Sequence, residues 1–240
     1  MLFPAHITDI VCHVIQSADR QIRTELQHGY IASENDYTSN LTGTIRRQIN
    51  GAGHPGLQAQ SLVLKPGVER KVGADACIIF ANRSEFKVGI FEAKWPRLST
   101  HTDSWDAVQA SLGQSHFDSQ LDRQSAWLAH FAVWEMFYLE HPFTLQPQGL
   151  PDHSSACFWH ADVYAVSGQR IRTGRWRDHE LLRLGPVHDI EHIAREICAC
   201  RAGVAMAGSD YAGAVTQFPD TPAGALVIRF DDERDPASWG

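Results

Sequence analysis

The chain has 240 residues, with 21 Lys and Arg against 28 Asp and Glu, so its formal net charge is −7. Hydrophobic residues make up 43% of it, which excludes a disordered or low-complexity protein and leaves one large domain or two small ones. No apolar run is long enough to span a membrane, and the first residues lack the pattern of a secretory signal. The five scattered cysteines favour reduced thiols, so we expect a cytoplasmic protein.

Hydrophobic periodicity predicts two helices at the start of the chain, from about Pro4 to Gln27 and from Ser33 to about Asn50. The second begins with a capping-box pattern, in which Asp36 stands where Glu or Gln is usual, and glycines at 51–56 end it. Strands are predicted at 57–64, 74–81 and 86–94, and a turn at 82–85 joins the last two.

The second half of the chain is predicted to begin with a helical region over about 113–139, broken or continuous. Within it, a stripe of aromatic side chains indicates a core helix or a dimer interface; the stripe consists of Trp127, Phe131, Trp134 and Tyr138. A fourth strand is predicted at 156–166, a helix from Pro186 to about Arg201, and a short strand at 225–230.

The second and third strands carry apolar residues on both faces, as central strands covered by helices on both sides do. Cys77, Ile79, Val88 and Ile90 lie on one face, and Ile78, Phe80 and Phe91 on the other. We therefore expect an α/β fold, a three-layer α/β/α sandwich with a mixed central sheet. Its parts would be an N-terminal helical segment (1–32), a core (33–166) and a C-terminal extension with an acidic tail packed on the same domain (167–240).

Three charged residues come together on the predicted hairpin. If the turn is centred between residues 83 and 84, the numbers of paired residues sum to 167, so Asp75 faces Glu92 with Cβ atoms roughly 5 Å apart. Lys94, two residues beyond Glu92, shares that face. Two such close carboxylates repel each other unless a cation lies between them, and Mg²⁺, with Mn²⁺ as a substitute, prefers oxygen ligands of this kind. The alternative interpretation is a structural ion network.

The order of elements and the pattern Asp75…Glu92-Ala93-Lys94 resemble the PD-(D/E)xK nuclease superfamily, which has a restriction-endonuclease-like fold, over Ser33 to about Val166. The resemblance implies that Asp75 and Glu92 bind Mg²⁺ together with the carbonyl of Ala93, and that Lys94 lies beside the nucleophilic water. The family's usual Pro-Asp is Ala-Asp here, so only the aspartate of that half of the motif matches.

Two further residues are candidates for the same site. Glu34 heads the apolar stripe of the second helix and could supply a third carboxylate, or it could simply favour the helix dipole. In the family the helix after the third strand often supplies a Gln or a basic residue, and among the polar residues of 114–124 we select Gln120. A solvated polar helix face is the alternative interpretation there, and His116 is a supporting candidate.

One rival motif is present near the C-terminus. His188-Asp-Ile-Glu191-His192 matches the H-x-x-E-H pattern of inverted zincins, whose two histidines would share a helix face. It makes a zinc peptidase a remote alternative, because few acidic residues remain to complete the ligand set.

We therefore expect a Mg²⁺-dependent nuclease, a DNA endonuclease acting in defence, toxin or repair, with a homodimer as one way to cut both strands. The segment 46–97 has nine basic and four acidic residues within an acidic chain. Phosphate contacts are expected from Arg46, Arg47, Lys65, Arg70, Lys71 and Arg97. The alternative is a non-catalytic nuclease-like module that binds a protein or nucleic-acid partner.

Overall fold

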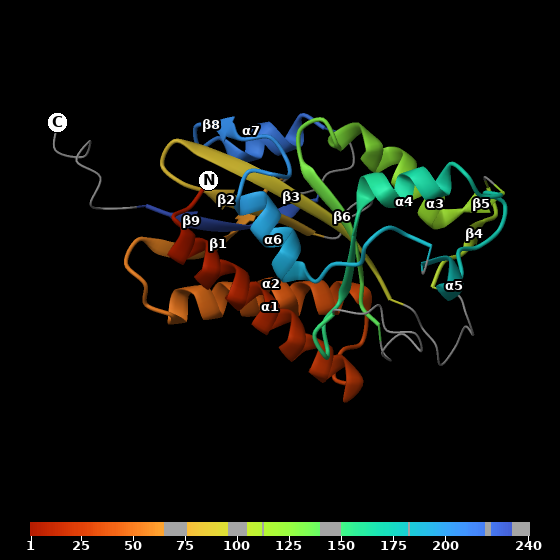
Figure 1. The fold of residues 1–240 in the computed structure, drawn as a ribbon, viewed down its shortest axis with the longest axis horizontal. Helices are drawn as coiled ribbons and strands as arrows, with labels where there is room; N and C mark the ends of the chain where they lie inside the picture. Colours follow the sequence, from red (N-terminus) through yellow and green to blue (C-terminus); the bar gives the residue numbers. More distant parts are fainter. Residues whose placement is uncertain are drawn as a thin grey trace.

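The computed structural model describes residues 1–64, 76–95, 105–111, 113–139, 150–181, 183–218 and 222–231. These residues form a mixed seven-stranded sheet flanked by helices (Figure 1). The strand order is β1-β9-β2-β3-β6-β7, and β8 pairs with β3. The β2–β9 and β3–β6 pairs are parallel, whereas the other pairs are antiparallel. The α/β class with a mixed central sheet is the one predicted from the sequence.

The first half of the chain follows the predicted elements closely. Its bounds are α1 (Ala5–Gln27), α2 (Glu34–Gly51), β1 (Leu57–Val63), β2 (Ala76–Ala81) and β3 (Glu85–Lys94). Ser33 caps α2 by accepting a hydrogen bond from the backbone N–H of Asp36 at 3.1 Å. The carboxylate of Asp36 reaches back to the N–H of Ala32 at 2.9 Å, one residue before the cap, so the reciprocal half of the capping box is displaced.

The predicted hairpin register is confirmed for the described residues. Ala76 pairs with Phe91 and Cys77 with Ile90, so paired numbers sum to 167. The two faces also separate as predicted: Val88 and Ile90 lie in one hydrophobic cluster, and Phe91 lies in another. Alternation along the strand places all even-numbered β3 side chains after the turn on the first of these faces.

The second half of the chain differs from its prediction in two places. Its elements are β4 (Val108–Gln109), β5 (Gln114–Ser115), α3 (His116–Gln124), η1 (Ser125–Trp127), β6 (Ala132–Phe137), β7 (Ala156–Trp159), α4 (His160–Ser167), α5 (Asp178–Leu181), α6 (Ile190–Cys198), β8 (Met206–Ala207), α7 (Tyr211–Thr216) and β9 (Gly224–Phe230). The aromatic run expected to be helical is strand β6, and the expected fourth strand ends at Trp159, where α4 begins.

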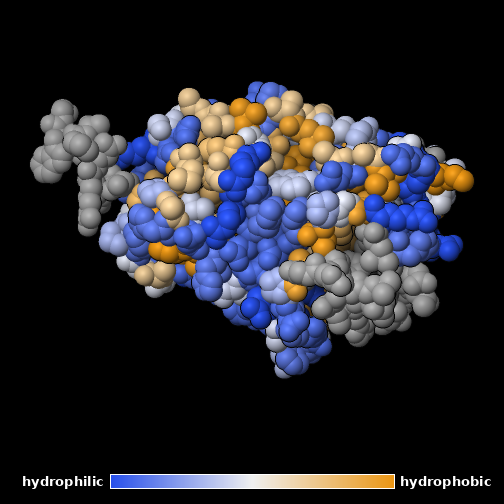
Figure 2. All heavy atoms as spheres, viewed as in Figure 1, coloured by the Kyte–Doolittle hydropathy of each residue, from blue (hydrophilic) through white to orange (hydrophobic). Residues whose placement is uncertain are grey.

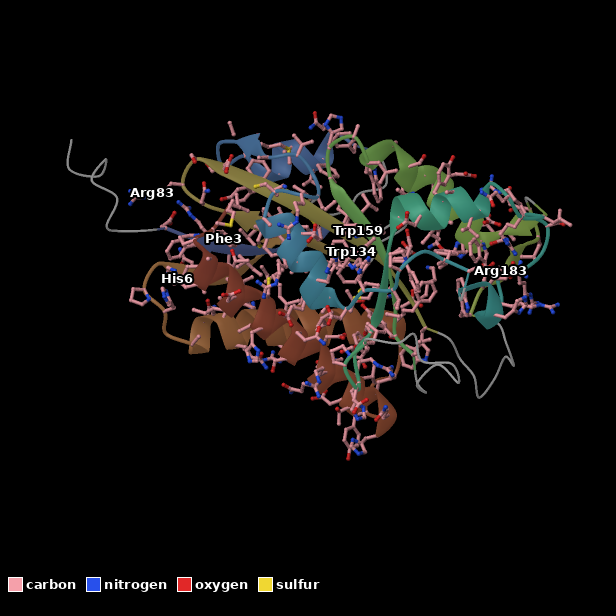
Figure 3. The ribbon with its side chains drawn as sticks, in the orientation of Figure 1. Phe3, His6, Arg83, Trp134, Trp159 and Arg183 are labelled. Carbon is pink, nitrogen blue, oxygen red and sulfur yellow. The ribbon has the colours of Figure 1, made fainter. Side chains whose placement is uncertain are left out.

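Strand β6 explains why the helical prediction was wrong. Its side chains are buried on both faces, so its apolar residues form a continuous run that fits a helical stripe as well as a central strand. Trp134 packs in the cluster of α1, α2 and α6, and Phe131 packs on the opposite face. Trp134 also pairs in register with Trp159 of β7, and both are labelled in Figure 3.

The predicted C-terminal strand is confirmed, but it lies inside the sheet. Strand β9 separates β1 from β2, pairing antiparallel with the first and parallel with the second. Of the first three strands of the chain, β2 and β3 are therefore neighbours, whereas β1 is separated from them by β9.

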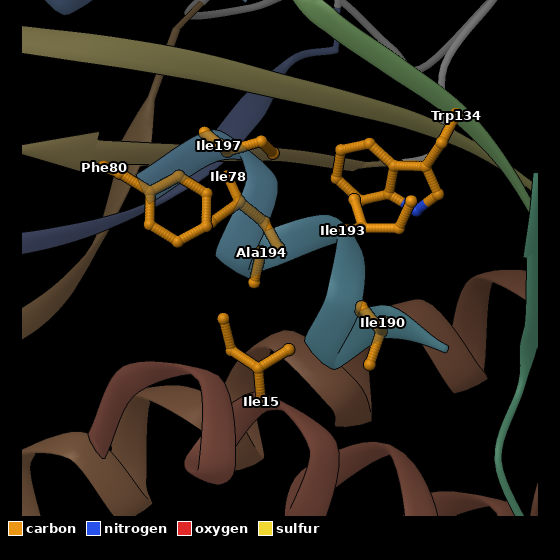
Figure 4. Close-up of a pocket in the computed structure, with 8 residues that line it drawn as sticks. All are labelled: Ile15, Ile78, Phe80, Trp134, Ile190, Ile193, Ala194 and Ile197. Carbon is orange, nitrogen blue, oxygen red and sulfur yellow. The ribbon is translucent and has the colours of Figure 1, made fainter. Parts of the chain in front are cut away.

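Helices α1, α2 and α6 pack on one face of the sheet, and α3, α4 and α7 on the other. Figure 4 shows the tight apolar junction of α1, α6 and the sheet, where Ile15, Phe80, Trp134 and Ile197 meet. On the face seen in Figure 2 the surface over α1 is mainly hydrophilic, and apolar side chains gather around α7 and β8. In the described part of the chain, no helix combines the length and the apolar character needed to cross a membrane.

Candidate active site at the end of strand β3

Glu92 and Lys94 lie on one face of β3, at the C-terminal end of the strand. Both are buried, with 3% and 6% of their surface exposed, and Lys94 Nζ lies 2.6 Å from Glu92 Oε1. Removing two such charges from water is costly, and the pair is stable only if further hydrogen bonds satisfy its remaining polar atoms. The structure supplies them from the helix that covers this face.

Helix α3 places two glutamines against the carboxylate of Glu92. Ser115 caps the helix by accepting from the N–H of Asp118 at 3.0 Å. Gln120 and Gln124 are four residues apart, so they share one helix face. Gln120 Nε2 donates to Glu92 Oε1, and Gln124 Nε2 donates to Glu92 Oε2 at 3.0 Å. Of these two, the sequence analysis selected only Gln120.

The first turn of α3 surrounds the lysine. Lys94 Nζ lies 5.5 Å from the ring centroid of Phe117, within the range of a cation–π contact. Partial burial lowers the pKa of His116, and the charge of Lys94 lowers it further. The ammonium of Lys94 thus contacts a carboxylate and an aromatic ring, and its charge makes the imidazole of His116 harder to protonate.

Glu34 reaches the same end of β3 from the other layer. It is half-buried at the start of α2, and its Oε2 accepts a hydrogen bond at 3.3 Å from the backbone N–H of Trp95, the residue after Lys94. The structure therefore brings Glu34 to the end of the strand, where the backbone is one of its partners.

A second buried pair lies beside Glu92 and was missed. Glu135 of β6 is the in-register partner of Glu92, and its Oε1 lies 2.7 Å from Nδ1 of His160, the first residue of α4. Both side chains are fully buried. Glu135 is a single acid within the apolar run 131–139. That signal was available, but it points to the Glu92 face only if the run is read as a strand.

The other predicted site residues either lie outside the described residues or make contacts elsewhere. Asp75, Lys65, Arg70, Lys71 and Arg97 lie outside the described residues. The side chain of Ala93 is buried on the opposite face of the sheet from Glu92. Only its backbone carbonyl was predicted to bind the metal ion. The guanidinium of Arg46 donates to Ser61 of β1 at 3.2 Å, and that of Arg47 to Thr44 at 2.9 Å.

The expectation that His188 and His192 share a helix face is wrong. His188 lies before the first residue of α6, because Asp189 caps that helix. The backbone of His188 exchanges hydrogen bonds with that of Cys157 instead. The two imidazoles stack with centroids 4.1 Å apart, and Glu191 is paired with Arg195 at 3.0 Å. Across the ranges that the structure describes, no three His, Cys, Asp or Glu side chains are grouped to hold a metal ion.

Comparison of the chain with protein-family models, with curated proteins and with solved structures finds no match.

Proposed function

We propose that the chain is a Mg²⁺-dependent nuclease that hydrolyses phosphodiester bonds of DNA, built on a restriction-endonuclease-like core. The observation that carries the proposal is the buried Glu92–Lys94 pair, held at 2.6 Å on one strand face and fixed by two glutamines of α3. A carboxylate and an ammonium two residues apart on a strand, with matching support from a covering helix, form a preorganised site for charge that develops at phosphorus.

The residues present suit a hard cation. Gln120 Oε1 is buried beside Glu92 and has no hydrogen-bond partner among the described residues. A bound cation would compensate this oxygen. The sequence predicts that Asp75, which lies outside the described residues, faces Glu92. Asp75, Glu92, the carbonyl of Ala93 and Glu34 would hold Mg²⁺ or Mn²⁺. Bound there, the ion would neutralise charge on the phosphate oxygens.

The chain's own residues have distinct parts in the proposed hydrolysis. Gln120 and Gln124 fix the orientation of the Glu92 carboxylate, which in turn fixes Lys94. The ammonium of Lys94 orients a water molecule, whose oxygen forms a bond to phosphorus as the bond from phosphorus to the leaving sugar oxygen breaks. The attacking water gives up a proton to solvent and the leaving sugar oxygen takes one from solvent, so the products are a phosphate monoester and a sugar hydroxyl.

A plasmid-cleavage assay with a matched pair of lysine variants tests the proposal. Lys94→Met removes the charge at the site, whereas Lys87→Met removes an equally buried charge from the same strand on its opposite face. We expect Mg²⁺-dependent cleavage that EDTA abolishes, a loss of about a hundredfold or more in Lys94→Met, and activity close to wild type in folded Lys87→Met. Intact plasmid with the wild type, or equal cleavage by wild type and Lys94→Met, would contradict the proposal.

The same variants separate the enzyme from a non-catalytic binding module. If the wild type binds DNA but cuts neither DNA nor RNA, the nuclease-like module becomes the better interpretation. If it cuts RNA alone, the reaction stands and the substrate is corrected.

A further inference from the structure

We infer that Glu135 supplies a further carboxylate ligand to a divalent cation bound at Glu92, and that His160 holds Glu135 in place for this purpose. The inference rests on the cation of the proposed function, but it does not depend on the nature of the substrate.

The sheet itself brings the two carboxylates together. Glu92 and Glu135 are register partners on the parallel strands β3 and β6. Their neighbours Ile90 and Val133, also register partners, pack in one hydrophobic cluster, so both acids lie on the same face. Adjacent strands are about 4.8 Å apart. Two glutamate side chains that start from this spacing can reach one ion at the Mg²⁺–oxygen distance of about 2.1 Å.

Two buried oxygens around this position, Glu135 Oε2 and Gln120 Oε1, lack hydrogen-bond donors among the described residues. Glu135 is fully buried, and its Oε2 has no hydrogen-bond partner within the described ranges of the chain. The same holds for Oε1 of Gln120, whose amide nitrogen donates to Glu92 and therefore anchors this oxygen beside Glu92. A buried carboxylate oxygen with no donor costs free energy unless a cation or a water compensates it. Two acids and an amide oxygen form an all-oxygen set, which is the preference of Mg²⁺ and Mn²⁺.

His160 has the geometry of a residue that supports a ligand. Its Nδ1 donates to Glu135 Oε1 at 2.7 Å, which leaves Oε2 directed elsewhere. Carboxylates that bind metals are commonly oriented by such an outer hydrogen bond. The ring is fixed in turn, because it is fully buried and stacks on Tyr164 with centroids 5.8 Å apart. A purely structural Glu135–His160 pair would not account for the uncompensated Oε2.

The test measures Mn²⁺ binding to the purified full chain by electron paramagnetic resonance of the free ion, so that it does not depend on activity. We expect Glu135→Gln to weaken binding by about ten- to a hundredfold. The matched control is Asp19→Asn, which removes another fully buried acid, on α1 at the opposite face of the sheet. It should bind Mn²⁺ as the wild type does.

A histidine pair keeps the test decisive even if Glu135→Gln fails to fold. His160→Asn retains a donor at the position of Nδ1 and should bind Mn²⁺ nearly as well as wild type, whereas His160→Gln loses that donor and should bind about tenfold more weakly or worse. Equal affinity in both His160 variants and in the wild type would overturn the inference, as would a wild type that binds no Mn²⁺.

Cleavage assays on the same preparations separate this inference from the proposed function. DNA cleavage together with Mn²⁺ binding that is insensitive to Glu135→Gln would refute the part assigned to Glu135 and leave the nuclease standing. Binding that depends on Glu135 in a protein that cuts no nucleic acid would support the site and refute the nuclease.

Discussion

Gly89 of β3 lies beneath the indole of Trp134, which comes from the neighbouring strand β6. A Cβ added at Gly89 would be 2.9 Å from Cζ3 and 3.2 Å from Cη2 of this indole, and 3.1 Å from Cδ1 of Ile197 on α6. Real Cβ atoms essentially never come as close as 2.9 Å to another heavy atom. The indole has little room to move, because it also stacks on Phe91 with centroids 5.1 Å apart. Gly89→Ala should therefore destabilise the fold.

The size of the effect follows from two opposing contributions. Overpacking a methyl group into a tight core costs about 1–3 kcal/mol. The gain in strand propensity and the lower chain entropy of alanine offset about 0.5–1 kcal/mol, because Gly89 does not have a positive φ that alanine would avoid. With the central value of each contribution, the net loss is about 1 kcal/mol, which for a chain of this length lowers Tm by about 2–4 °C.

Urea unfolding of four proteins checks this reasoning: wild type, Gly89→Ala, Trp134→Phe and the double variant. Trp134→Phe removes the two indole carbons that meet the new methyl group, so the double variant should be more stable than the sum of the single changes predicts, by at least about 0.5 kcal/mol. A Gly89→Ala protein as stable as wild type, or strict additivity in the double variant, would refute the argument that the indole occupies this space.

Four other results are expected. In an NMR titration, Lys94→Met should raise the pKa of His116 towards its ordinary value, because the ammonium helps to lower it; an unchanged pKa would contradict their proximity. Folding lowers the pKa of His116, so protonation of this residue opposes folding. The resulting loss of folding stability is absent at high pH and grows as the pH falls below the ordinary pKa of histidine. His116→Asn should therefore lose less stability in acid than the wild type. Asp118→Ala should cost about 1–3 kcal/mol in urea unfolding, because it removes the 2.6 Å partner of Arg170, which keeps Glu180 at 3.2 Å, and leaves the buried indole N–H of Trp176 without its acceptor; a loss under about 0.5 kcal/mol would contradict this. Ser33→Ala should cost about 1 kcal/mol through the lost cap of α2, and no measurable change would show that the cap is not needed.

The candidate site was partly readable from local pattern. Alternation and a short turn fix which residues of a hairpin face each other, so the shared face of Glu92 and Lys94 followed from the sequence. The four-residue spacing of the glutamines follows in the same way from helix geometry. Which of them touches Glu92 depends on how α3 lies across the sheet, and both do.

The placement of Glu135 was not readable, because it depends on a pairing between strands far apart in the chain. A run buried on both faces loses the alternation that marks a strand, and only the neighbours β3 and β7 decide that residues 132–137 are extended. His160 likewise meets Glu135 only once α4 packs against β6.

By itself, the sequence determined the helices and strands whose signals are local: capped amphipathic helices, a tight turn, and the order of residues along one hairpin. The tertiary structure alone decided that β9 enters between β1 and β2, that β6 is a strand, and that Glu135 lies beside Glu92. The physical reason is that strand neighbours are chosen by competition among distant segments for the same backbone hydrogen bonds and the same buried surface, and a local pattern does not record the outcome of that competition.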